Sequence, residues 1–301
     1  MWQFIWAEER REYMPVTESP LRYPGGKTKI YDKVQTIINQ NMDIQSRIYV
    51  EPYAGGAGLA LKLLYSGDVQ KLVLNDFDYH IFCFWHICLE QTDDLCSMIE
   101  SCNISIEEWN RQKKIYDNVD TYTQVEVGFA TFFLNRCNVS GIIKGGPIGG
   151  LEQKGTYKLD ARFNKENLIK KIRKVASYKD VIEFYNMDAI VFLDEVVERI
   201  ESNNIFLNID PPYVKKGPML YKNSYTEADH RAIADKVSSI RKKWIVTYDE
   251  CELIRDLYGK FRIDKMQLNY SAGNTKKGQE YIVYSNLLRV ENDNDRENAN
   301  S

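Results

Sequence analysis

The tetrapeptide Asp210-Pro211-Pro212-Tyr213 is the segment whose residue types most clearly suggest chemistry. It follows the apolar run 205–209, and a short apolar run that ends in an acid and two prolines predicts a buried strand that stops abruptly. Because proline brings no N–H, the carbonyls here are free to accept hydrogen bonds from a ligand. A carboxylate, a carbonyl and a tyrosine ring suit a planar group that carries an NH2, such as the exocyclic amine of a nucleobase. For the tetrapeptide alone, a simple Asp-Pro turn is the alternative.

A glycine-rich turn at residues 51–58 forms a second candidate site. It lies between a short predicted strand at 47–50 and an apolar helix, where glycines let a ligand approach the backbone closely. Asp76 follows the next predicted strand, 71–75. Its carboxylate can accept hydrogen bonds from two ribose hydroxyls. Both sites therefore lie at predicted strand ends.

Two common nucleotide-binding patterns are incomplete in this sequence. Leu61 stands where a dinucleotide fingerprint after Gly58 would have its third glycine. Leu21 stands where a Walker loop through Gly26-Lys27-Thr28 would have its first glycine. These departures argue against a nucleotide hydrolase.

The elements that must position these residues alternate between strand and helix. This alternation over 47–78 and 178–290 predicts an α/β fold with a mostly parallel sheet. The stretch between them is mainly helical and runs into a glycine-rich segment, 141–155. We therefore predict a catalytic domain of residues 18–79 and 178–290, an inserted subdomain at 80–177 and a disordered tail at 291–301.

Composition excludes several classes of protein. The chain has 301 residues and a net charge of −3, so any nucleic-acid contact must come from a local basic patch. Its six cysteines form no Cys-x-x-Cys pair, which favours free thiols in a reducing compartment. The histidines and cysteines at 80–88 lie among aromatic residues, and we interpret them as helix core, not as a metal site. No apolar run is long enough for a membrane span, and we expect a soluble, intracellular protein.

Five segments, in this order, resemble the Dam-like class (class D12) of DNA adenine-N6 methyltransferases over residues 20–290. They are Leu21-Arg22-Tyr23-Pro24-Gly25-Gly26-Lys27, residues 51–58, Asn75-Asp76, Phe132-Phe133-Leu134-Asn135-Arg136 and Asp210–Tyr213. The resemblance implies a Rossmann-like S-adenosylmethionine-dependent methyltransferase fold in which the insert recognises the target. It implies S-adenosylmethionine as cofactor, double-stranded DNA as partner, and no metal or membrane. It also implies a cytoplasmic protein of a bacterial or phage-type host that is a monomer in solution. A cognate restriction endonuclease stays open as a partner.

The resemblance assigns roles to individual residues. The catalytic set is Asp210, Pro211, Pro212 and Tyr213. The cofactor-binding set is Tyr23, Gly26, Lys27, Glu51, Tyr53, Gly55, Gly56, Gly58, Asp76, Asp188 and Asp210. The DNA-binding set is Arg22, Asn135, Arg136, Val139, Ser140, Lys144, Lys215, Lys276 and Lys277. For Asp188 the alternative is the N-cap of a helix that begins at Ala189.

The sequence departs from the subgroup that reads GATC, which carries an aromatic-Asn-Gly triplet followed by Arg. Here the triplet is Val139-Ser140-Gly141, and Lys144 replaces the Arg. Valine cannot stack like an aromatic ring, and lysine lacks the bidentate fork suited to guanine. We therefore expect methylation of adenine at a site other than GATC. The alternatives are an RNA or protein-amide methyltransferase and a non-catalytic DNA-binding protein. The predicted hairpin at 135–150 favours DNA.

Overall fold

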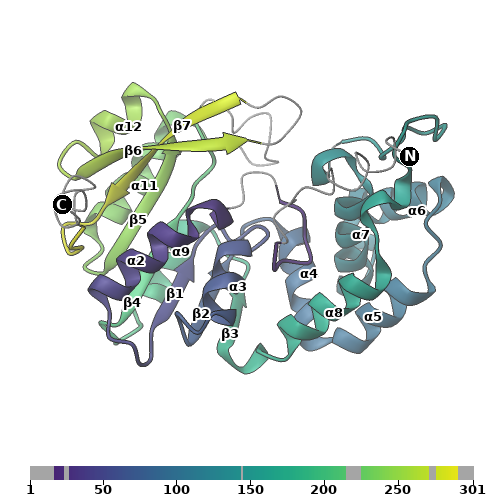
Figure 1. Ribbon diagram of the computed structural model, residues 1–301, viewed down its shortest axis with the longest axis horizontal. Helices are drawn as coiled ribbons and strands as arrows, with labels where there is room; N and C mark the ends of the chain where they lie inside the picture. The colour runs from purple at the N-terminus through teal and green to yellow at the C-terminus, as the bar shows by residue number, and fades with distance from the viewer. Residues whose placement is uncertain (1–16, 24–26, 144, 215–224, 271–275, 291–301) are drawn as a thin grey trace, which may run out of the picture.

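The fold is built on one seven-stranded sheet, shown at the left of Figure 1. The computed structural model describes residues 17–23, 27–143, 145–214, 225–270 and 276–290. The strand order is β3-β2-β1-β4-β5-β7-β6, and β7 is antiparallel to both of its neighbours while the other pairs are parallel. The strands are β1 (Ile48–Glu51), β2 (Lys71–Asn75), β3 (Ile182–Tyr185), β4 (Ile205–Ile209), β5 (Lys243–Asp249), β6 (Arg262–Tyr270) and β7 (Lys276–Tyr284).

Successive strand residues face opposite sides of the sheet, so each strand contributes to two cores. Tyr49 joins a core with α2 (Tyr31–Asn41) and α3 (Gly58–Tyr65), whereas its neighbour Val50 joins a core on the other face. The elements that cover the second face are α9 (Ala189–Phe192), the π-helical turn η6 (Leu193–Val197), α11 (Glu227–Ser239) and α12 (Glu252–Leu257). Helices on both faces explain why the central strands are continuous apolar runs.

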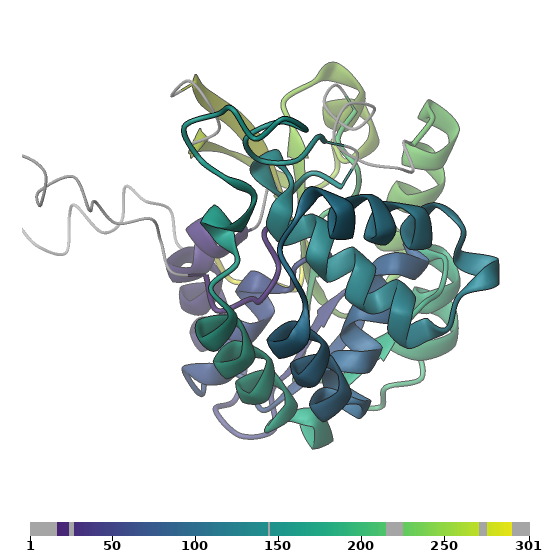
Figure 2. The same cartoon turned by 90° about the vertical axis from the view of Figure 1, so that its right-hand side faces the viewer.

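Five helices lie in the connection between β2 and β3 and form the right-hand part of Figure 1, which faces the viewer in Figure 2. They are α4 (Tyr79–Glu90), α5 (Thr92–Ser101), α6 (Ile106–Asp117), α7 (Gln124–Cys137) and α8 (Lys165–Ala176). α7 begins with a capping box, in which Thr123 and Glu126 satisfy each other's backbone N–H groups. α11 begins in the same way at Thr226 and Asp229, as their spacing predicts.

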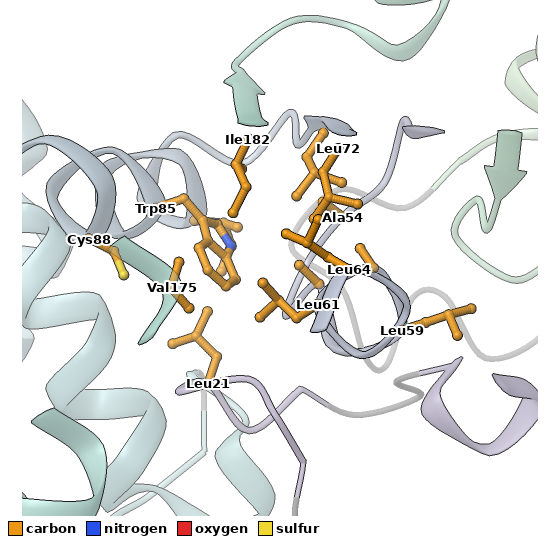
Figure 3. Packing of buried hydrophobic residues seen from close by; sticks show 14 of the residues in the cluster. Leu21, Ala54, Leu59, Leu61, Leu64, Leu72, Trp85, Cys88, Val175 and Ile182 are labelled. Carbon is orange, nitrogen blue, oxygen red and sulfur yellow. The ribbon is translucent and has the colours of Figure 1, made fainter. Parts of the chain in front are cut away.

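The helical segment shares its core with the sheet domain. Trp85 of α4 packs beside Leu61 of α3, Val175 of α8 and Ile182 of β3 (Figure 3). The indole Nε1 of Trp85 also donates to the carbonyl of Gly55, over 2.9 Å. α4 is therefore fixed to the glycine-rich turn after β1.

The prediction of a Rossmann-like α/β fold is confirmed by the strand order and the helices on both faces. The predicted hairpin at 135–150 is wrong in detail: among its described residues, pairing is limited to one bridge, between Asn138 and Pro147. This segment holds three glycines at positive φ and a 3-10 turn, η3 (Val139–Gly141), which are incompatible with extended strands. The predicted tail lies outside the described residues. No helix in the described ranges is long and apolar enough to cross a bilayer.

Candidate active site

The predicted site acids lie at one edge of the sheet. β1 to β5 are mutually parallel, so their C-terminal ends meet at the same edge. Glu51 ends β1, Asp76 follows β2, and Asp210 follows β4. Asp249, which the sequence-based prediction missed, ends β5. A row of carboxylates along this edge favours a ligand that carries positive charge or several hydrogen-bond donors.

Both carboxylate oxygens of Asp210 are held by the protein. Oδ2 lies 2.8 Å from the Nζ of Lys27, and Oδ1 accepts a hydrogen bond from the Thr247 hydroxyl over 2.6 Å. The side chain of Asp210 is 18% exposed, so it is still accessible from the edge of the sheet. The carboxylate is thus fixed in orientation before any substrate binds.

Lys27 links the N-terminal motif to the catalytic motif. Its side chain is 6% exposed, and its Nζ donates to the Tyr213 hydroxyl over 2.6 Å. The same Nζ lies 3.9 Å from Glu280 of β7, a buried acid that the sequence-based prediction also missed. Lys27 therefore brings one positive charge into a group of buried carboxylates, which makes burial of that group less costly.

β5 holds the catalytic motif at both ends. Thr247 bonds to Asp210 at the start of the tetrapeptide, and Oδ1 of Asp249 accepts from the backbone N–H of Val214, just after its end, over 2.9 Å. Thr247 and Asp249 are two residues apart, so both point to the same face of the strand. Both are almost fully buried. The strand was predictable from sequence, but these contacts across 35 or more residues were not.

Asp76 connects the glycine-rich turn to the start of α4. Its Oδ2 accepts from the N–H of Gly55 over 2.8 Å, and its Oδ1 accepts from the N–H of Asp78 over 2.9 Å. Burial raises the pKa of Asp76 to about 7, although the two backbone donors oppose the shift. This carboxyl is therefore poised to ionise near neutral pH.

Glu51 is the second acid with a raised pKa. It is 5% exposed, and its Oε1 accepts from the Tyr49 hydroxyl over 2.8 Å and from the Asn208 amide over 3.3 Å. Burial raises its pKa to about 7, with a further contribution from nearby Asp210. A positive group placed between these acids would lower both values.

The glycine-rich turn packs against the N-terminal motif. A Cβ on Gly55 would lie 2.6 Å from the Tyr23 ring, and Gly55 has a φ of +47°. From the sequence, we expected a glycine here because a ligand approaches the backbone. The structure gives a second reason, because the Tyr23 ring lies where a Cβ would be. Two motifs that are separate in sequence therefore form one wall of the site.

Three further residues near the C-terminal ends of β1, β2 and β3 are candidates for ligand contact. Asp188 caps α9, because its Oδ1 accepts from the N–H of Ile190 over 2.9 Å, which matches the alternative reading from sequence. The residue is exposed. Phe77, which was not predicted, is 57% exposed, and Asn186 donates to its carbonyl over 3.1 Å. Tyr53, two residues after the end of β1, shares a hydrogen bond with the hydroxyl of Tyr225 over 2.8 Å.

The predicted DNA-binding residues of the helical segment divide into buried and exposed groups. Asn135 is 2% exposed and uses its amide to bond both the N–H and the carbonyl of Arg22, so its role is to position Arg22. Arg136 donates through Nε to the carbonyl of Arg162 over 2.8 Å. Val139 and Ser140 are exposed.

Five predicted site residues lie wholly or partly outside the part of the chain that the structure describes. Gly26, Lys144 and Lys215 lie outside the described residues. Lys276 and Lys277 begin β7, and their side chains are not described. Among the described side chains, no group of three or more His, Cys, Asp or Glu residues could hold a metal ion.

Comparison with known proteins gives one family. The model of the D12 class N6 adenine-specific DNA methyltransferases matches residues 23–272. A curated relative, the Type II methyltransferase M.MjaIII of Methanocaldococcus jannaschii, is 22% identical over 221 residues, which cover 69% of this chain and 73% of the relative.

Two solved structures are more distantly similar. The rRNA methyltransferase aviRa from Streptomyces viridochromogenes aligns with a TM-score of 0.41 and 10% identity, over 91% of this chain and 94% of that one. An uncharacterized protein from Listeria monocytogenes serotype 4b aligns with a TM-score of 0.36 and 9% identity, over 89% of this chain and 72% of that one.

Proposed function

The chain belongs to the D12 class N6 adenine-specific DNA methyltransferase family, and we propose that it transfers a methyl group from S-adenosylmethionine to the N6 of an adenine that has left the duplex stack. The observation that supports this most strongly is the fixed carboxylate of Asp210 beside the Pro211 carbonyl. The target base must be flipped out to reach this motif, at a cost of about a few kcal/mol.

The chemistry follows from two acceptors placed on one amine. Each oxygen of Asp210 already accepts one hydrogen bond, and a carboxylate oxygen has two acceptor positions, so one more N–H can bind. The Pro211 carbonyl accepts the second N–H. These bonds oppose delocalisation of the nitrogen lone pair into the ring and orient it for attack. Because the amine becomes acidic once it carries the methyl, Asp210 need not be a strong base to take up or pass on the released proton.

The residues at this edge fit the cofactor by charge. When bound, S-adenosylmethionine supplies an electrophilic methyl group on a positively charged sulfur. Desolvation raises the pKa values of the acids Glu51 and Asp76 to about 7, as expected where a positive charge is to be bound. We assign Asp76 to the ribose hydroxyls, Glu51 to the positively charged end, and the exposed Phe77 to the flat face of the base.

Tyr213 has two roles in the proposed reaction. Its ring would stack on the flipped adenine, and its hydroxyl holds Lys27 in place. The ring is 5% exposed, so the base must displace neighbouring groups to reach it. If 2-aminopurine replaces the target adenine, its fluorescence should rise when duplex DNA binds, because unstacking relieves quenching.

Methyl transfer from labelled cofactor to duplex DNA tests the proposal. Asp210→Asn keeps the shape of the side chain but replaces an acceptor by a donor, and we expect no detectable transfer. Asp235→Asn, on the exposed surface of α11, is the matched control and should be fully active. Circular dichroism checks that both variants fold. Near wild-type transfer by Asp210→Asn would contradict the proposal.

A further inference from the structure

A cavity of about 520 Å³ is formed by Arg22 of the N-terminal motif and by loops of the helical segment. Its lining residues include Arg22, Val139 and Ser140 of the turn η3, and Tyr157 and Arg162 of the loop before α8. Three of these residues were predicted from sequence to bind DNA. Tyr157 and Arg162 were not.

The wall that carries Arg22 is rigid. The Oδ1 of Asn135 accepts from the Arg22 N–H over 2.8 Å, and the Arg22 guanidinium donates to the carbonyl of Asn138 over 3.1 Å. A Cβ on Gly141, which has a φ of +75°, would lie 2.4 Å from the Arg22 carbonyl. Only glycine permits this contact, so η3 and the N-terminal motif form one unit.

The loop that carries Tyr157 and Arg162 is fixed through its backbone. Arg136 donates to the Arg162 carbonyl over 2.8 Å, which leaves the Arg162 side chain available. Gln153 closes the loop before it, because its Nε2 donates to the Ile148 carbonyl over 2.8 Å and its Oε1 accepts from the Leu159 N–H over 2.9 Å. The guanidinium of Arg162 lies 5.8 Å from the ring centre of Tyr157, within cation–π range.

The cavity concentrates positive charge without an opposing carboxylate. Within the described ranges, no ion pair joins Arg22, Arg136 or Arg162 to an acid. Burial and the neighbouring Arg162 lower the pKa of Arg22, and burial and Arg22 lower that of Arg136 to about 10. Two guanidinium groups that line one cavity, Arg22 and Arg162, favour binding of an anion, and a phosphate is an anion that arginine binds well.

We propose that this cavity binds a phosphate of the DNA backbone, with Arg22 and Arg162 as its charged walls and Tyr157 as the residue that orients Arg162. The inference rests on the proposed function, since it takes DNA as the substrate. A phosphate contact fixes the register of the duplex but reads no base. The cavity would thus set how the target adenine is presented to the sheet edge.

Affinity for short duplexes over a series of salt concentrations tests the site. Arg162→Ala should weaken binding about tenfold on every sequence and reduce the salt slope by about one, because one phosphate contact is lost. Arg111→Ala removes an exposed arginine of α6 that pairs with Glu108, and it should change neither quantity. Arg162→Lys should keep the slope. If Arg162→Ala binds with wild-type affinity and slope, the proposal is overturned.

Tyr157 carries no charge and acts by orienting Arg162. Variants of Tyr157 therefore test the orientation of Arg162 while its charge is kept. Tyr157 is 65% exposed, and replacing it should not disturb the core. Tyr157→Phe keeps the ring and should bind as wild type, whereas Tyr157→Ala should lose affinity about threefold at low salt. Equal binding by both variants would show that Tyr157 does not orient Arg162.

Inorganic phosphate at constant ionic strength distinguishes the two sources of this anion. A free-phosphate site would bind it with micromolar affinity in the wild type but not in Arg162→Ala, while both would bind DNA equally; that result overturns the proposal. Methyl transfer by the wild type is measured on the same preparation. If the wild type is active and Arg162→Ala binds unchanged, only the cavity assignment fails; if the wild type transfers no methyl to any duplex, the proposed function fails.

Discussion

The Thr247 hydroxyl donates to Oδ1 of Asp210 over 2.6 Å, and Thr247 is itself fully buried. This bond joins the centre of β5 to the first residue of the catalytic motif at the end of β4. Lys27 binds the other carboxylate oxygen, Oδ2, so the two contacts together fix the orientation of the Asp210 side chain. The reactivity of Asp210 therefore depends on a residue that touches neither substrate nor cofactor.

Removal of that hydroxyl should slow methyl transfer while leaving the fold intact. Thr247→Val keeps the volume but deletes a hydrogen bond to a charged group, worth about 1.5–3 kcal/mol, or roughly tenfold to a hundredfold in rate. Thr247→Ser restores the donor and should recover most activity. Single-turnover rates measure the effect, with KM as a separate readout. A Val variant as fast as the Ser variant would contradict the positioning role.

Lys27 should matter for stability as well as for activity. Lys27→Met leaves the partly buried Asp210 and the buried Glu280 without the nearby positive charge of Lys27, and removal of one partner of a buried pair costs about 3–5 kcal/mol. Urea unfolding measures the loss. Adding Glu280→Gln to Lys27→Met should recover part of it, because one of the stranded charges is gone. If the double variant is less stable than Lys27→Met, the charge argument is wrong.

Stability and cofactor affinity should have opposite pH dependence near neutrality. Burial raises the pKa values of Glu51 and Asp76 to about 7 in the folded protein. Because these values lie above the unfolded ones, about 4, the stability they contribute is present in acid and is lost as pH rises through about 7. A bound cation favours the ionised acids, so S-adenosylmethionine should bind more tightly as pH rises and release protons.

Calorimetry at pH 7 in two buffers of different protonation enthalpy measures that release. Glu51→Gln removes one titrating group, so it should reduce proton release and flatten the loss of stability above about pH 5. Asp235→Asn is again the surface control. Cofactor affinity that does not change with pH, with no proton release, would show that Glu51 does not contact the positively charged end of the cofactor.

Much of the fold and the position of the site could be predicted from local sequence. The apolar runs that end at Asp76 and Asp210 defined β2 and β4, and parallel order placed their ends at one edge. What could not be predicted depends on contacts between distant residues. The sequence near Thr247, Asp249 and Glu280 carries no sign that strand pairing brings all three to the catalytic motif.

The helical segment shows a second limit of sequence patterns. Asn135 and Arg136 are polar residues in a motif of the family, and they were predicted to face DNA. In the structure, the Asn135 amide bonds to the backbone N–H and carbonyl of Arg22, and the Nε of Arg136 donates to the Arg162 carbonyl. Arg162 and Tyr157 belong to no motif of the family resemblance, and only the folding of the loop before α8 brings them into one cavity with Arg22.

The most direct test of the central claim is base-resolved sequencing of modified DNA. Purified protein is incubated with S-adenosylmethionine and unmethylated DNA that contains all short sequence combinations. We expect N6-methyladenine at one short motif that is not GATC, and none with Asp210→Asn. Methylation confined to GATC would show that Val139 and Lys144 were misread, while absence of N6-methyladenine at every sequence would contradict the account as a whole.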